Sequence, residues 1–328
     1  MKRRMLFSAA IPLVFGTRRS VAQPAARKVR IGFLGSSADP VTLRAQVEPF
    51  RQGLGELGWT EGQNLAPIEF RWSEGRYERF PALLDELLRL DLELLVTAGP
   101  RPAMLAKEAT KTLPIVAIAV DDPVEMGLAA SIARPGGNIT GISAAFSGLL
   151  SKRLQLLKDI VPAARRFAIV FNPASAPPKS LAEAVPRWEA GLGVAVSLAE
   201  VRGPDDFDAA FAALVKERVN GVVFVADAMI WVQRAKLGDL CLKHRLPSVW
   251  GGGAYLDAGG LASYQGDWPS LFRRGAALVD KILRGTKPGE IAFEQGTKLE
   301  LVVNLKGARV LGITIPKSVL LSADEVLE

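Results

Sequence analysis

Short apolar, β-branched runs alternate with stretches of helical periodicity along this chain, and no other feature constrains its fold as strongly. Residues 29–35 form the first run, after which Phe50 and Leu54 begin a helical spacing. Residues 92–99 and 115–120 are continuous apolar runs, as expected of strands buried on both faces of a parallel sheet. Strands separated by helices in this order predict right-handed βαβ units and an α/β fold.

The same rhythm returns in the second half of the chain. Four further strand candidates, separated by helical patterns, lie at residues 167–172, 194–201, 219–227 and 246–251. A helix-like segment at 146–161 connects the two sets, and a strand-helix pair at 261–264 and 268–283 follows the second set. A length of 328 residues suits about two domains. The sequence therefore predicts two α/β sheets in two lobes, with more than one crossing between them.

The charge distribution argues against a nucleic-acid partner. The formal net charge is +7, but five basic residues and no acidic ones lie within residues 1–22. Beyond that segment 36 basic and 34 acidic residues remain, a net charge of +2. So small a charge cannot supply the clustered positive field that phosphate-backbone binding requires.

The N-terminus has the pattern of a cleavable export signal. Basic residues 2–4 precede the apolar stretch 5–16, and a small-x-small site ends at Ala22, before Gln23. The apolar stretch is shorter than the roughly 20 residues that span a bilayer, so stable membrane insertion is not expected. The pattern leaves Sec and twin-arginine export both open. Residues 1–22 are therefore expected to be a signal peptide, and the mature chain is expected in a bacterial periplasm.

The residue inventory disfavours most catalytic centres. Cys241 is the only cysteine and His244 the only histidine, which excludes an internal disulfide, a cysteine metal cluster and a three-histidine zinc site. A Ser-His-Asp triad would need His244, which lies in a helix-to-strand passage. No glycine-rich dinucleotide motif follows the first strand. We expect no catalytic residue, metal or cofactor, although residue counts leave a carboxylate-only sugar or nucleoside enzyme open.

Candidate ligand contacts follow from the predicted strand ends. In open parallel sheets, ligands bind beyond the carboxyl ends of the strands. The candidates are Ser36, Ser37, Ala98, Gly99, Asp121, Ser143, Asn172, Asp227, Trp250 and Gly251. Hydroxyl and N–H donors at Ser36, Ser37 and Gly99 would suit a carboxylate.

Several of these residues have a local alternative. Ser36 and Ser37 can simply cap a helix, and Asp227 can cap the helix that begins near Met229. Asp39 and Asp122, each followed by proline, are expected to be N-caps. Asp121 has no such capping role: it could pair with a ligand amine, or it could be an exposed, solvated carboxylate. The glycine run at 251–253 is expected to leave room in a cleft wall, which would enlarge the pocket, or to free the hinge.

Many short segments, in one order, resemble a known family. They include residues 50–64 (Phe-Arg-Gln-Gly-Leu through Glu-Gly-Gln-Asn), 69–75, 122–125, 134–141 (Arg-Pro-Gly-Gly-Asn-Ile-Thr-Gly), 152–157, 244–247, 259–264, 281–288 and 315–326. Over nearly the whole mature chain the sequence resembles the solute-binding components of ABC importers, in the tryptophan/tyrosine-type group. It departs at Asp121, where the family usually has a small residue, at Ala228 in place of proline, and in the glycine run.

The resemblance implies the type I periplasmic-binding-protein fold, with two Rossmann-like lobes joined by a three-crossover hinge. The implied first lobe is 29–145 plus 255–285, and the second is 146–254 plus 286–328. The implied partners are a small-molecule ligand and an inner-membrane ABC permease with its ATPase, and the chain is expected to be a monomer. Acidic strand ends opposite donor-rich ends favour an amino acid or a relative. A periplasmic ligand sensor on the same fold, signalling to a membrane receptor, is the alternative.

Overall fold

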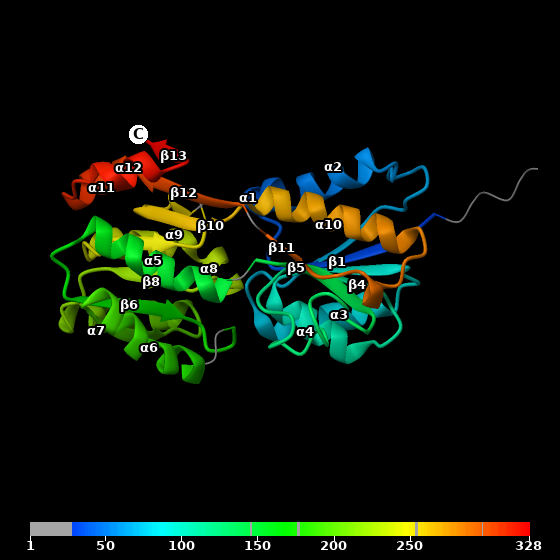
Figure 1. Cartoon of the computed structure of the whole chain (residues 1–328), viewed down its shortest axis with the longest axis horizontal. Helices are drawn as coiled ribbons and strands as arrows, with labels where there is room; N and C mark the ends of the chain where they lie inside the picture. The colour runs from blue at the N-terminus through cyan, green and yellow to red at the C-terminus, as the bar shows by residue number, and fades with distance from the viewer. Residues whose placement is uncertain (1–27, 145, 176–177, 253–254, 297) are drawn as a thin grey trace, which may run out of the picture.

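A computed structural model describes residues 28–144, 146–175, 178–252, 255–296 and 298–328. These residues form two lobes side by side, each built around its own sheet (Figure 1). The predicted signal peptide lies outside the described residues. Among the described helices, none combines the length and apolarity that crossing a bilayer requires.

The first lobe contains a six-stranded sheet whose pairs are all parallel. Its strands, in spatial order, are β11 (Glu294–Gln295), β5 (Ile139–Ser143), β4 (Ile115–Val120), β3 (Leu94–Ala98), β1 (Ile31–Gly35) and β2 (Glu69–Trp72). Helices α2 (Glu48–Glu56) and α10 (Trp268–Leu283) cover one face, and α3 (Phe80–Leu88) and α4 (Pro100–Ala109) cover the other (Figure 1). The central strands are fully buried, as their continuous apolar runs predict.

The second lobe contains a seven-stranded sheet. Its strands, in spatial order, are β13 (Glu325–Leu327), β12 (Leu299–Asn304), β10 (Ala262–Gly266), β9 (Ser248–Trp250), β8 (Val222–Phe224), β6 (Arg166–Phe171) and β7 (Ala195–Glu200). Only the β10–β12 pair is antiparallel. Around the sheet lie α5 (Phe146–Ile160), α6 (Pro178–Leu192), α7 (Phe207–Lys216), α8 (Ala228–Val232), α9 (Arg234–Lys243), α11 (Leu305–Leu311) and α12 (Lys317–Ser322). The predicted α/β class with two largely parallel sheets is thereby confirmed.

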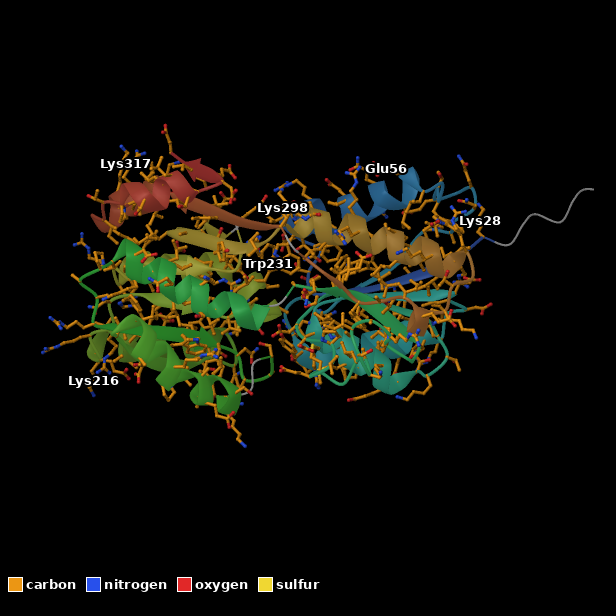
Figure 2. All side chains as sticks on the ribbon, viewed as in Figure 1. Lys28, Glu56, Lys216, Trp231, Lys298 and Lys317 are labelled. Carbon is orange, nitrogen blue, oxygen red and sulfur yellow. The ribbon has the colours of Figure 1, made fainter. Side chains whose placement is uncertain are left out.

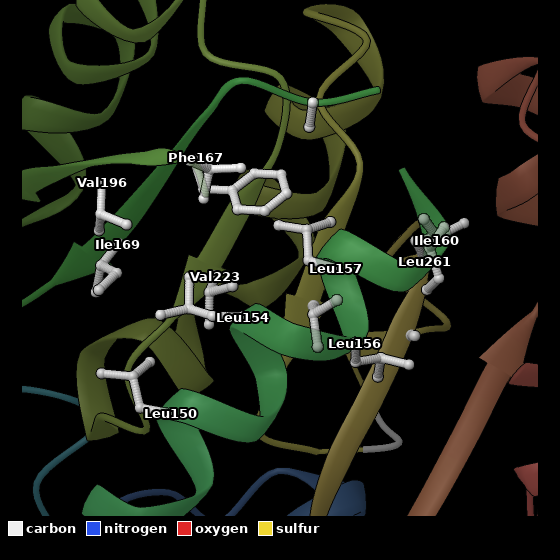
Figure 3. Packing of buried hydrophobic residues seen from close by; sticks show 14 of the residues in the cluster. Leu150, Leu154, Leu156, Leu157, Ile160, Phe167, Ile169, Val196, Val223 and Leu261 are labelled. Atoms are coloured by element: carbon white, nitrogen blue, oxygen red, sulfur yellow. The ribbon is translucent and has the colours of Figure 1, made fainter. Parts of the chain in front are cut away.

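Helix α5 docks on this sheet through one apolar stripe. Leu150, Leu154 and Leu157, spaced by three and four residues, face Ile169 and Val223 of the sheet (Figure 3). All five side chains are buried, so this contact contributes hydrophobic stabilisation in proportion to the apolar area that it removes from water. Because these three leucines fix which face of α5 meets the sheet, they also fix which of its other side chains point into the lobe.

The chain crosses between the sheets three times: after β5, after β10 and after β11. The implied lobe boundaries differ from this arrangement. β10 pairs with β9 of the second sheet, whereas β11 pairs with β5 of the first. Residues 255–266 therefore lie with the second lobe and 286–296 with the first. Hydrogen bonding decides the membership, because Leu261 N–H donates to Ser248 O, and Phe293 N–H donates to Ile132 O.

Cys241 belongs to the core between α7, α8 and α9. Its side chain is buried. Burial raises the pKa of the thiol to about 12, although a hydrogen bond with Ser248 acts in the opposite direction. Because the thiolate is the reactive species, we expect the native thiol to react with iodoacetamide at least about 1,000-fold more slowly at pH 8 than the unfolded chain does. Mass spectrometry of labelled native and guanidinium-unfolded protein measures this ratio. Rapid labelling of the native chain would contradict the buried placement.

Candidate ligand site between the lobes

The carboxyl ends of the two sheets border the space between the lobes. β5 ends at Ser143 and leads into α5 of the second lobe, while β10 ends at Gly266 and leads into α10 of the first. Each crossing thus leaves its sheet from a carboxyl end, and the other parallel strands of that sheet end at the same edge. This is the edge at which open α/β sheets bind ligands.

Side-chain contacts join the lobes along one side. Tyr77 Oη donates to Asp227 Oδ2 at 2.7 Å, and Trp231 Nε1 donates to Thr42 Oγ1 at 2.8 Å. The third contact is an ion pair between Asp39 and Arg234, with 3.3 Å between Oδ2 and Nη1. Trp231 lies between the lobes in Figure 2. Helix α8 and the start of α9 therefore lie directly against α1 (Pro40–Thr42) and the turn at 75–77.

Asp227 has two roles in this contact. Its Oδ1 accepts the N–H of Ile230 at 2.8 Å, which caps α8, and Oδ2 accepts the Tyr77 hydroxyl. Ser175 is a further hydrogen-bond partner. Burial raises the pKa of Asp227, although these hydrogen bonds oppose the shift. The capping alternative is thus confirmed, and the carboxylate also holds the lobes together.

The two serines that follow β1 form hydrogen bonds within the protein. Ser37 Oγ donates to Asp39 Oδ2 at 3.0 Å, and the backbone carbonyl of Ser36 accepts the N–H of Gly75. Asp39 caps α1 as predicted, by accepting the N–H groups of Val41 and Thr42. Burial opposes ionisation of Asp39, but the Thr42 hydrogen bond and the Arg234 charge hold its pKa below the usual value.

The end of β3 offers fewer donors than expected. Gly99 has a φ of 100°, which suits glycine, and its N–H donates to Ile118 O at 2.8 Å. The expectation that this N–H is available to a ligand carboxylate is therefore wrong. Pro100 and Pro102 at the start of α4 also have no N–H. Ala98, the last residue of the strand, is buried.

The ends of β4 and β5 lie side by side. Ser143 pairs with Val120, immediately before Asp121, after a register irregularity at Ala119. Ala119 has a φ of 59°, and such a bulge redirects the strand that follows it. Ser143 is buried and Asp121 is half-buried. Asp122 accepts the N–H groups of Val124 and Glu125, but it closes a turn rather than a helix.

Asn172 lies at a second, more open part of the boundary. Its Oδ1 accepts the N–H of Ala174 at 3.0 Å, so its amide shapes the turn that follows β6. A pocket of about 490 Å³ lies here, lined from the first lobe by residues 75–78 and from the second by Asn172, Met229 and residues 202–204. Within the described ranges, no group of His, Cys, Asp and Glu side chains is placed to hold a metal ion.

Trp250 and the glycines after it do not form an open wall. Trp250 is completely buried, stacked between Phe224 and Tyr255, and its indole N–H donates to Ser248 Oγ at 2.7 Å. It is a core residue, because both ring faces and its donor are used by the protein. A Cβ at Gly251 would lie 2.9 Å from the Arg153 guanidinium, and one at Gly252 would lie 2.9 Å from the Tyr255 ring. Neighbouring side chains fill the space beside these two glycines. The expectation that they leave room for a ligand is therefore wrong. Residue 253 lies outside the described residues.

Arg153 is the residue at this edge that sequence reasoning missed. It lies on α5, is only 1% exposed, and its Nε donates to the backbone carbonyl of Tyr264 at 2.8 Å. Burial lowers the pKa of the guanidinium to about 10, although the electrostatic effect of Tyr255 raises it. The group is therefore charged at neutral pH. The sequence signal that could have found it is a cation next to Leu154, within the apolar stripe of a predicted helix. Arginine is rarely fully buried without a partner, so a cation at such a position indicates a specific role.

Two largely parallel sheets, three crossings and facing carboxyl ends define a periplasmic-binding-protein-like architecture. The chain belongs to the ABC transporter substrate binding protein family, whose sequence pattern matches residues 39–327. This is a family of binding proteins, not of enzymes.

Several known proteins are similar to this chain. A tyrosine-binding protein of Clostridioides difficile (strain R20291) is 23% identical over 255 residues, 78% of this chain and 73% of the relative. A conserved domain protein from Vibrio cholerae has a similar structure, with a TM-score of 0.83 and 26% identity over 92% of this chain and 100% of that one. An ABC domain from Streptococcus pneumonia in complex with L-Trp has a TM-score of 0.82 and 24% identity, with the same coverage.

Proposed function

We propose that this chain is the periplasmic solute-binding component of an ABC importer and that it captures an amino acid or a close relative between its lobes. The observation that carries the proposal is the placement of charged groups of both signs at the carboxyl ends of the two sheets: Asp121 directly after β4, and the Arg153 guanidinium beside Gly251 and Tyr264. A zwitterion carries the complementary pair of charges. The tyrosine-binding relative and the L-Trp complex support the same ligand class.

The proposal includes export and delivery. Residues 1–22 would be removed on export, and the mature monomer would present its ligand to an inner-membrane permease with its ATPase. A ligand enters between the sheet edges only when the lobes separate. We therefore infer that the contacts of Tyr77 with Asp227, of Thr42 with Trp231 and of Asp39 with Arg234 break on opening and re-form on closure, with the three crossings as the hinge.

A thermal-shift panel of amino acids, short peptides, sugars and purines tests the ligand class. Ligand at 100 times its dissociation constant stabilises the native state by about 2.7 kcal/mol. We expect amino acids to raise the melting temperature by several degrees and the other classes to leave it unchanged. Stabilisation by sugars or purines, with no effect of amino acids, would overturn the proposed ligand.

Two adjacent substitutions sharpen this test. Asp121→Ala removes the carboxylate proposed to pair with the ligand ammonium and is expected to abolish most of the amino-acid shift. Asp122→Ala removes a neighbouring carboxylate whose hydrogen bonds serve a turn. It is the matched control and should retain the shift. Equal shifts in both variants would exclude Asp121 from the site.

A further inference from the structure

The Arg153 guanidinium is a buried charge that the protein itself leaves incompletely paired. Its Nε bonds to the Tyr264 carbonyl, but its Nη2 has no hydrogen-bond partner among the described residues. Among the residues that the structure describes, no carboxylate forms an ion pair with it, and the electrostatic effect on its charge comes from Tyr255. An ionised group removed from water without a counter-charge is costly, so such a group in a binding protein indicates a missing anionic partner.

The side chain reaches the edge of the sheet that borders the first lobe. Helix side chains point toward the helix N-terminus, and the N-terminus of α5 is where the chain arrives from β5 of the first lobe. Figure 1 shows α5 running across the second lobe to the boundary. The guanidinium accordingly ends beside Gly251, immediately after β9, with Tyr264 of β10 as its carbonyl partner.

The local sequence accommodates a guanidinium at this point. The ideal Cβ position at Gly251 lies 2.9 Å from Nη2, 3.1 Å from Cζ and 3.3 Å from Nη1. Any larger residue at position 251 would therefore displace the group. Nε is fixed by a carbonyl, and Nη2 keeps an unused donor on a planar guanidinium of the kind that binds carboxylates.

We infer that Arg153 is the anion anchor of the site and binds the carboxylate of the ligand, while Asp121 faces its ammonium group. This inference rests on the proposed function for the location of the ligand between the lobes. It adds that recognition requires a carboxylate, and it assigns that recognition to the second lobe rather than to Ser36, Ser37 and Gly99.

Four probes of one shape test the inference by calorimetry on the full mature chain. They are L-tyrosine, L-tyrosinamide, tyramine and 3-(4-hydroxyphenyl)propionate. Hydrogen bonds to charged groups contribute about 1.5–3 kcal/mol, so we expect L-tyrosine to bind about 10- to 100-fold more tightly than L-tyrosinamide. Equal binding of these two would overturn the inference and leave the proposed function intact. Binding of the propionate but not of tyramine would support Arg153 even if the amino-acid proposal failed.

Variants assign the preference to Arg153. In Arg153→Met the preference for L-tyrosine over its amide should fall to within about threefold of unity, and Arg153→Lys, which keeps the charge but loses the planar guanidinium, should be intermediate. Lys152→Met removes an exposed cation from the same helix and should retain the preference. Removing an unpaired buried charge should leave the melting temperature of the unliganded protein unchanged or higher. A preserved preference in Arg153→Met, or a folding defect in that variant, would show that the guanidinium serves the fold instead.

Discussion

Replacing Trp250 with alanine is expected to lower the free energy of unfolding by about 3–5 kcal/mol, the range for large buried aromatic residues. The indole is completely buried, its ring centroid lies 3.7 Å from that of Phe224 and 4.7 Å from that of Tyr255, and its N–H is bonded to Ser248. Truncation leaves a cavity between two aromatic rings and a hydroxyl without its donor. Denaturant unfolding followed by far-ultraviolet circular dichroism measures the loss.

Trp250→Phe is the matched control, because it keeps a ring in the stack and removes only the outer part of the indole and its N–H. We expect it to cost clearly less than the alanine variant. The pair also separates a core residue from a ligand contact. If Trp250→Ala unfolded like the wild type but no longer bound ligand, the core assignment would be wrong.

Gly141→Ala is expected to destabilise the first lobe by about 3 kcal/mol or more, at the upper end of the range for overpacking. Gly141 pairs with Ala117, and a Cβ there would lie 1.9 Å from the Ala117 carbonyl oxygen. Because the obstacle is backbone, no rotamer change relieves the clash and β4 must move away from β5. These strands end at Asp121 and Ser143, so ligand affinity should fall as well.

Gly148→Ala provides the comparison for Gly141→Ala. Gly148 lies in α5, and no heavy atom is within 4 Å of its ideal Cβ position. Alanine is favoured over glycine inside a helix by about 0.5–1 kcal/mol, so this variant should be slightly more stable than the wild type. Chemical denaturation of both variants gives the difference. Equal stability of the two would mean that β4 and β5 are farther apart than the structure shows.

Local pattern was sufficient for much of the fold. β1, β3, β4 and β6 lie where continuous apolar runs predict them, because a strand buried on both faces needs such a run wherever it sits in the sheet. α10 likewise follows its periodic spacing. Only the carboxyl end of β5, at Ser143, was predicted, since its sequence Ile-Thr-Gly-Ile-Ser is not a continuous apolar run and includes the glycine that close pairing requires.

Candidate site residues were predicted less well, because their roles depend on partners that are distant in sequence. Asp227 meets Tyr77 across 150 positions, and Arg153 meets Tyr264 across 111. A strand-end position predicts that a residue lies near the boundary, as Asp121 and Ser143 do. It cannot predict that the Gly99 N–H is already bonded to Ile118, or that Trp250 is enclosed by two rings.

The sequence by itself therefore determined the α/β class, the two sheets and the family, because these depend on periodicity and on short motifs that act within a few residues. Only the tertiary structure decided that β10 joins the second sheet and β11 the first. It also decided which buried polar groups find partners and that, among the described residues, Nη2 of the buried Arg153 guanidinium does not. Sheet membership and hydrogen-bond pairing are properties of segments brought together by folding, so no local pattern specifies them.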